Sequence, residues 1–177
     1  MARLESISPD RIAPEVAPIF AEIEQRFGFI PALFQTAAHY PPLLEANWNK
    51  VKAVMGSGNL ASRTKETIAV LVSQDNSCEY CVGAHSMALK SLGFSDEMVE
   101  RVKSLKLMEA GYNEQEIALI SFARKANSQP HRIPDEEYQQ LKALGISSSD
   151  IVEALGVMEL YAGFNKFLDA LEVEPEF

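Results

Sequence analysis

The sequence contains little cysteine: Cys78 and Cys81 are the two in a chain of 177 residues. A chain of this length buries enough apolar surface for a stable core, so the pair is not needed as a structural disulfide. Two cysteines seldom form a disulfide framework in a reducing compartment, and their close spacing therefore points to chemistry. We expect one domain that spans residues 1–177.

Positive charge is also scarce. Lys and Arg total 16 against 25 Asp and Glu, which gives a formal net charge of −9. No run of Lys or Arg is longer than two residues. Binding to phosphate backbones depends on concentrated positive charge, so this balance argues against nucleic acid as a partner.

Long apolar runs are absent. The longest wholly apolar stretch, residues 68–72, is far shorter than the roughly 20 residues of a membrane helix. The first residues, MARLESISPDRIAPEV, contain acidic side chains and prolines where a signal peptide needs an unbroken apolar segment. We expect a cytoplasmic protein without a membrane partner.

Strand-like alternation of apolar and polar residues is missing as well, and nearly every segment between Gly and Pro positions has helical spacing. The sequence therefore predicts an all-α, multi-helix bundle of about nine helices. We expect them near 14–28, from 31, 42–56, from 62 to the turn at 75–77, 78–92, from 95, 113–129, 134–145 and 149–171. The last segment is apolar on more than one face, which favours a homo-oligomer.

Several helix ends have local signals. Pro14 is expected at a first helical position and Ser62 as an N-cap. Asn113 followed by Glu116 has the spacing of a capping box. Ser149 and Asp150 are expected just before the last helix.

The residues that can carry chemistry lie at the start of the segment 78–92. Cys78, Cys81 and His85 occupy positions i, i+3 and i+7, so on a helix they share one face. Unpaired N–H groups at a helix start favour a thiolate and lower the pKa of a cysteine there. His85 lies one turn beyond Cys81, where its imidazole can take the thiol proton.

A carboxylate precedes this group by one helix. Glu66 lies twelve residues before Cys78. If the two helices pack antiparallel across the turn at 75–77, Glu66 comes level with His85. The three side chains would then form a carboxylate–imidazole–thiol relay.

Glu66 followed by CEYCVGAH resembles the alkyl hydroperoxidase D-like (AhpD-like) members of the carboxymuconolactone decarboxylase superfamily. The context from the Trp48 helix through IAVLVSQDNSCEYCVGAH to PHRIP and FNKFLDAL is similar to their peroxidase-related branch. The resemblance implies an all-α fold assembled as homotrimers or hexamers. It also implies reduction of hydroperoxides by a cysteine pair without a metal or flavin of its own.

By the same resemblance, Cys81 is the peroxidatic thiol, Cys78 the resolving thiol, and Glu66 and His85 form the proton relay. The best-studied type has a histidine directly before the second cysteine, where this chain has Tyr80. A phenol with its usual pKa of about 10 does not shuttle protons near pH 7. The disulfide formed would need an external dithiol donor, a partner protein or a dihydrolipoyl group.

Other interpretations stay open. A zinc site would take Cys78, Cys81 and His85 with a fourth ligand from Glu66, His39 or His131. The two cysteines could instead be inert core residues. A redox-sensing oligomer would use the pair as a disulfide switch without efficient turnover. A lactone decarboxylase is disfavoured, because decarboxylases of the superfamily lack the cysteine pair. Trp48, Phe34 and Phe164 line a pocket or belong to the core.

Overall fold

The computed structural model describes residues 2–176, and within them the chain is all-α, with nine α-helices, two short 3-10 helices and no strand. This confirms the predicted fold class. None of the helices in this part of the chain combines the length and apolarity needed to cross a bilayer. The elements are η1 (Pro9–Arg11), α1 (Ala17–Phe27), α2 (Ala32–Ala37), α3 (Pro41–Met55), α4 (Ser62–Asp75), α5 (Glu79–Ser91), α6 (Asp96–Lys103), α7 (Glu114–Ser128), η2 (Pro130–Arg132), α8 (Asp135–Ala143) and α9 (Ser148–Leu171).

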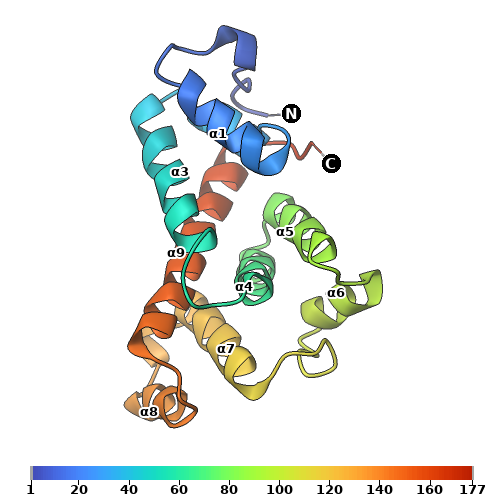
Figure 1. Cartoon of the computed structure of the whole chain (residues 1–177), viewed down its shortest axis with the longest axis vertical. Helices are drawn as coiled ribbons and strands as arrows, with labels where there is room; N and C mark the ends of the chain where they lie inside the picture. The colour runs from blue at the N-terminus through green and yellow to red at the C-terminus, as the bar shows by residue number, and fades with distance from the viewer. Residues whose placement is uncertain (1, 177) are drawn as a thin grey trace.

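The helix at the centre of the molecule is α4. Figure 1 shows it nearly end-on, with α5 and α7 on different sides, and it also packs against α6 and α9. All five residues of the apolar run 68–72 are 0% exposed. A helix that is apolar all round requires neighbours all round, which explains the uninterrupted run. The cysteine-bearing helix α5 packs against one side of this central helix.

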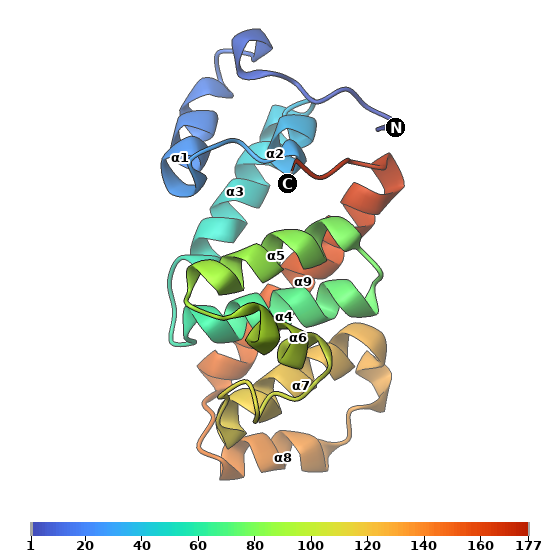
Figure 2. The same cartoon turned by 90° about the vertical axis from the view of Figure 1, so that its right-hand side faces the viewer.

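The helices α4 and α5 form an antiparallel hairpin, as the turn residues predict. They run side by side in Figure 2. Ser77 has a φ of 62°, and the Cys78 N–H donates to the Ser73 carbonyl over 2.9 Å, which closes the turn. This tight reversal brings the start of α4 level with the middle of α5.

Two of the predicted helix starts are wrong by a few residues. The first long helix begins at Ala17 with Pro18 in its first turn, so Pro14 lies outside it. Ser62 is the first residue of α4 and not its N-cap, which is Ala61 without a side-chain hydrogen bond. Sequence signals for helix starts are local, and Pro14 and Pro18 both suit a first helical turn.

Other helix ends have the expected chemistry. The capping box of Asn113 and Glu116 is present at the start of α7. The last helix begins at Ser148 and has a capping box between Ser147 and Asp150, slightly earlier than expected. Its apolar faces are largely covered within the chain, by α3, α4, α5 and α7. The homo-oligomer stays a prediction.

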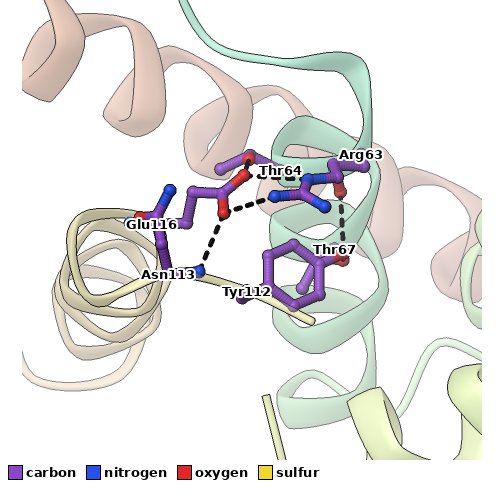
Figure 3. A network of polar contacts seen from close by, with 6 residues as sticks. All are labelled: Arg63, Thr64, Thr67, Tyr112, Asn113 and Glu116. Atoms are coloured by element: carbon purple, nitrogen blue, oxygen red, sulfur yellow. Dashed lines mark hydrogen bonds and ion pairs between the residues drawn. The ribbon is translucent and has the colours of Figure 1, made fainter. Parts of the chain in front are cut away.

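Glu116 also joins α7 to α4 (Figure 3). One carboxylate oxygen accepts hydrogen bonds from Arg63 Nε over 2.9 Å and Thr64 Oγ1 over 3.0 Å. The other accepts from Arg63 Nη2 over 2.7 Å and the Asn113 N–H over 3.0 Å. Below this pair, Tyr112 donates to the Arg63 carbonyl over 3.2 Å and contacts the Thr67 hydroxyl.

A buried ion pair ties the loop after α3 to α4 and α9. The side chain of Lys65 is 3% exposed, and its Nζ lies 2.6 Å from Glu153 Oε1. Lys65 also donates to the carbonyls of Val54 and Ser57. Glu153 accepts the Asn59 N–H over 2.8 Å. Every polar atom of the pair is thus engaged, which is what a buried charge requires.

We expect Lys65→Met to lower the free energy of unfolding by about 3–5 kcal/mol, because it leaves the Glu153 carboxylate buried without its cation. Urea unfolding at neutral pH measures the change. Lys50→Met is the matched control, because Lys50 and Glu159 pair at the surface; its loss should stay below about 1 kcal/mol. Similar losses in both variants would contradict the interpretation.

We expect Glu116 to make stability fall in acid. Burial raises the pKa of its carboxyl, but the hydrogen bonds from Arg63, Asn113 and Thr64 outweigh burial and leave the pKa below the ordinary 4.5. A lowered folded-state pKa gives stability that is present above the unfolded value and lost as the pH falls through the folded value.

The difference in unfolding free energy between wild type and Glu116→Gln should therefore narrow as urea titrations move from pH 7 to about pH 2–3. A difference that stays constant over this range would show that the charge of the Glu116 carboxylate does not contribute to the free energy of unfolding.

Candidate functional site

A cavity of about 520 Å³ lies between the N-terminal helices α1–α3 and the hairpin α4–α5. Its walls are mostly apolar, and a few polar side chains converge in it, which is the usual character of small-molecule sites. The lining residues from the N-terminal part include Arg26, Phe27, Phe29, Leu33, Phe34, Val51 and Met55. Those from the remaining elements include Glu66, Tyr80, Cys81, His85, Met87, Leu92, Tyr161, Phe164 and Glu176.

Glu66 and His85 meet in this cavity, as the hairpin predicted. His85 Nδ1 lies 2.6 Å from Glu66 Oε2, and the two side chains are 16% and 17% exposed. When Nδ1 donates to the carboxylate, Nε2 of the neutral imidazole is left without a proton and can accept one. The pair thus provides a base whose orientation is fixed by its partner.

Tyr161 completes this side of the pocket. Its ring stands edge-on to the His85 ring, with 4.2 Å between centroids. Burial raises the pKa of the Tyr161 phenol well above its usual value, and the nearby charge of Glu66 adds to the effect. Tyr161 therefore stays a neutral O–H donor. The sequence analysis did not identify Tyr161, although a tyrosine among the apolar residues of α9 indicates a buried hydroxyl that needs a hydrogen-bond partner.

The two cysteines are reduced thiols with different surroundings. Cys78 is the N-cap of α5, is 0% exposed and does not line the cavity. Cys81, one turn on, is 3% exposed and lines it. A molecule in the pocket can therefore reach the sulfur of Cys81, with that of Cys78 behind it.

The pKa values of the two thiols shift in opposite directions. The hydrogen bond between them lowers the pKa of Cys78, while the same bond and then burial raise the pKa of Cys81. The Cys78 thiolate can accept a hydrogen bond from the Cys81 thiol, but ionisation of Cys81 would place a second negative charge beside the first and is opposed. The expectation that the helix start lowers the pKa is thus wrong for Cys81, because the interaction with Cys78 and then burial outweigh the effect of the helix start.

A buried polar chain supports Cys81 from the side away from the pocket. Asn165 is 0% exposed, and its amide donates to Ser73 Oγ over 2.9 Å. Asn76 donates to Asn165 Oδ1 over 2.9 Å and is itself paired with Asn127. Hydrogen bonds from Asn165 and Ser73 act against the raised pKa of Cys81. In the sequence, the one signal for these buried hydrogen bonds was a polar residue, Asn165, among the apolar residues of α9.

The Tyr80 hydroxyl makes structural hydrogen bonds and is not placed to transfer protons. It donates to Glu176 Oε1 over 2.9 Å and accepts the Leu33 N–H over 3.5 Å. Burial, followed by the charge of Glu176, raises the pKa of Tyr80. Tyr80 thereby holds the C-terminal segment against α2, where Glu176 also accepts the Ala32 N–H over 3.2 Å.

The remaining candidates lie elsewhere. His39 Nε2 is 2.8 Å from the Glu5 carbonyl, and His131 is exposed in η2. Phe34 and Phe164 line the cavity, whereas Trp48 packs behind Phe34 and is 2% exposed. Among residues 2–176, no three or more His, Cys, Asp or Glu side chains are grouped so as to hold a metal ion.

We expect Glu66→Gln to slow alkylation of Cys81 at pH 7 by about tenfold and to move its pH profile upward. The carboxylate stabilises the imidazolium that forms when His85 takes the thiol proton. Iodoacetamide reactivity against pH, in a Cys78→Ser background, measures the change. Glu79→Gln removes an exposed carboxylate from the first turn of α5 and should change neither quantity. An equal shift in both variants would contradict the relay.

Comparison with known sequences gives a match over the part of the chain that builds the site. The profile of the carboxymuconolactone decarboxylase family matches residues 41–125. An alkyl hydroperoxide reductase of Mycobacterium tuberculosis (strain ATCC 25618 / H37Rv) is 29% identical over 93 residues. This match covers 52% of the chain and 27% of the relative, so the chain spans only about a quarter of that protein.

Two solved structures show the same fold over nearly the whole chain. One is an uncharacterized peroxidase-related protein with an alkylhydroperoxidase AhpD core from Ralstonia eutropha JMP134, with a TM-score of 0.87 at 22% identity, covering 99% of this chain and 92% of that one. The other is a cysteine-to-alanine variant of the debrominase Bmp8 in complex with 2,3,4-tribromopyrrole, with a TM-score of 0.84 at 21% identity, covering 99% and 94%. The profile match over residues 41–125 and the shared fold thus make the chain similar to members of the carboxymuconolactone decarboxylase family.

Proposed function

We propose that the protein is a thiol-dependent peroxidase that reduces organic hydroperoxides at Cys81. The observation that carries the proposal is the position of Cys81: it lines an apolar pocket together with the Glu66–His85 pair, and Cys78, one helical turn away, is close enough to shift its pKa. The similarity to the carboxymuconolactone decarboxylase family over residues 41–125 and to an alkyl hydroperoxide reductase supports peroxidase-type chemistry.

In the first step, Nε2 of His85 takes the proton of Cys81, and Glu66 stabilises the imidazolium. The thiolate attacks the terminal oxygen of the hydroperoxide, and the O–O bond breaks. The departing alkoxide takes the proton back from His85, with the neutral Tyr161 hydroxyl available as a further donor. The products are an alcohol and the sulfenic acid of Cys81, which has lost two electrons.

In the second step, the sulfur of Cys78 attacks the sulfur of Cys81. An S–S bond forms, and the hydroxyl of the sulfenic acid leaves with the Cys78 proton as water. Cys78 lies one helical turn before Cys81 and interacts with it closely enough to shift its pKa, so this step competes with further oxidation of the sulfenic acid.

The cycle closes when an external dithiol returns two electrons. Its first thiolate attacks Cys81 from the pocket, because Cys78 is fully buried. The second thiolate then displaces Cys81 and leaves the donor as a disulfide. A slender arm such as a dihydrolipoyl group suits this route better than a cysteine on a flat protein surface. The cysteine pair thus needs no bound cofactor for this cycle, and we propose none.

A second candidate function is reductive debromination of an aromatic compound. It is favoured by the aromatic rings of Phe27, Phe34 and Phe164 at the pocket and by the similar fold of a debrominase. In such a reaction the two electrons of the cysteine pair replace a C–Br bond by C–H, and bromide leaves as the disulfide forms. Bromide release from 2,3,4-tribromopyrrole, compared with hydroperoxide consumption under the same conditions, separates the two activities.

We expect Cys81→Ser to abolish consumption of cumene hydroperoxide in the presence of dithiothreitol, a loss of at least about 100-fold. Without added thiol, Cys78→Ser should consume one equivalent and stop at a sulfenic acid, which dimedone traps and mass spectrometry detects.

Undiminished turnover in both variants would refute the proposal. A redox-sensing assembly makes a different prediction: its size in gel filtration changes between oxidised and reduced protein, while peroxide turnover stays low.

A further inference from the structure

Arg26 is the part of the pocket that the proposed reaction does not use. It lies in the last turn of α1 and is exposed to solvent. Its guanidinium carbon is 5.9 Å from the centroid of the Phe27 ring, and Nη1 passes close to Gly56. A Cβ on Gly56 would approach Nη1 to 3.1 Å, so the glycine leaves room for this side chain.

No carboxylate among residues 2–176 pairs with Arg26. The two acidic side chains that line the same cavity are engaged elsewhere. Glu66 accepts from His85, and Glu176 accepts from Tyr80 and the backbone of α2. Arg26 is the one Lys or Arg among the described residues of the lining. In a chain with a net charge of −9, a cation without an acidic partner at a pocket is an available anion site.

The charge of Arg26 extends into the reactive part of the cavity. It acts on the Tyr161 phenol, whose pKa it lowers against the larger effect of burial. Tyr161 in turn packs on His85. Arg26, His85 and Cys81 all line this cavity, so the guanidinium and the reactive thiol share one continuous space.

The space between them is apolar and large. A volume of about 520 Å³ is in the range of pockets for drug-sized ligands. Phe27 and Phe29 at its rim are 41% and 46% exposed, and Met87 is 41% exposed. Hydrogen peroxide would neither fill this space nor cover these side chains, whereas an extended apolar body would do both.

We propose that the substrate is an amphipathic anion: an organic hydroperoxide whose apolar body carries a carboxylate, as in a hydroperoxy fatty acid. The carboxylate binds Arg26, the body lies along the aromatic wall, and the hydroperoxide group reaches Cys81. This inference rests on the proposed peroxidase function for its reacting group, but the anion site itself is independent of the reaction.

Binding is tested with the reduced full-length protein and two probes that cannot react, decanoate and decanol. Trp48 is the single tryptophan, and its ring lies 5.9 Å from Phe27 and 5.6 Å from Phe34, so its fluorescence reports occupancy of the pocket. We expect Arg26→Gln to weaken decanoate binding about tenfold and to leave decanol binding unchanged. Arg26→Lys should retain most of the affinity.

Arg101→Gln is the matched control. It makes the same substitution on α6, outside the pocket, where Arg101 pairs with Glu97. It should leave both probes unaffected. If Arg26→Gln weakens decanoate and decanol equally, or neither, the anion site is refuted.

Turnover is tested with linoleic acid hydroperoxide and its methyl ester. Arg26→Gln should lower kcat/KM about tenfold for the acid and leave the ester unchanged. If Cys81→Ser stops turnover but the acid and ester respond alike to Arg26→Gln, the substrate proposal fails and the peroxidase stands. If Cys81 is dispensable while decanoate binding still depends on Arg26, the peroxidase fails and the anion site stands.

Discussion

The packing of α5 against α4 is the contact on which both the core and the site depend. α4 contributes the most deeply buried segment of the molecule, and α5 covers one of its sides. The same hairpin sets the register between Glu66 and His85, which lie 19 residues apart in the sequence and 2.6 Å apart in space. A shift of one residue along either helix would rotate one of the two side chains away by about 100°.

Burial creates the central conflict of this site. The interaction with Cys78 raises the pKa of Cys81, and burial in an apolar pocket raises it further because a thiolate is poorly solvated there. The same apolar surroundings allow an organic molecule to bind beside it. Neighbouring groups counter the effect from two directions, with the Glu66–His85 pair on the pocket side and the Asn165–Ser73 pair behind. The reactivity of Cys81 is thus set by neighbours more than by the helix start.

The residues that the sequence could predict are those whose geometry is local. Cys81 and His85 lie on α5, Cys78 is its N-cap, and a single short turn places Glu66 opposite His85, so helical periodicity was sufficient. Tyr161, Asn165 and Arg26 come from α9 and α1, far away along the chain. Their positions follow from how the helices pack, which no local pattern reports. The direction of the Cys81 pKa was missed because it depends first on the interaction with Cys78 and then on burial by these distant elements.

The complete burial of residues 68–72 also bears on how much the protein can move during a redox cycle. A helix enclosed on all sides opens only when its neighbours separate, so α4 belongs to the most slowly exchanging part of the structure. The Cys78–Cys81 segment is attached to it through one tight turn with Ser77 at a positive φ. If Cys78 and Cys81 cycle as proposed, we expect the conformational adjustment between dithiol and disulfide to be confined to that turn and the first turn of α5, and the pocket walls contributed by α4 and α9 to keep their shape.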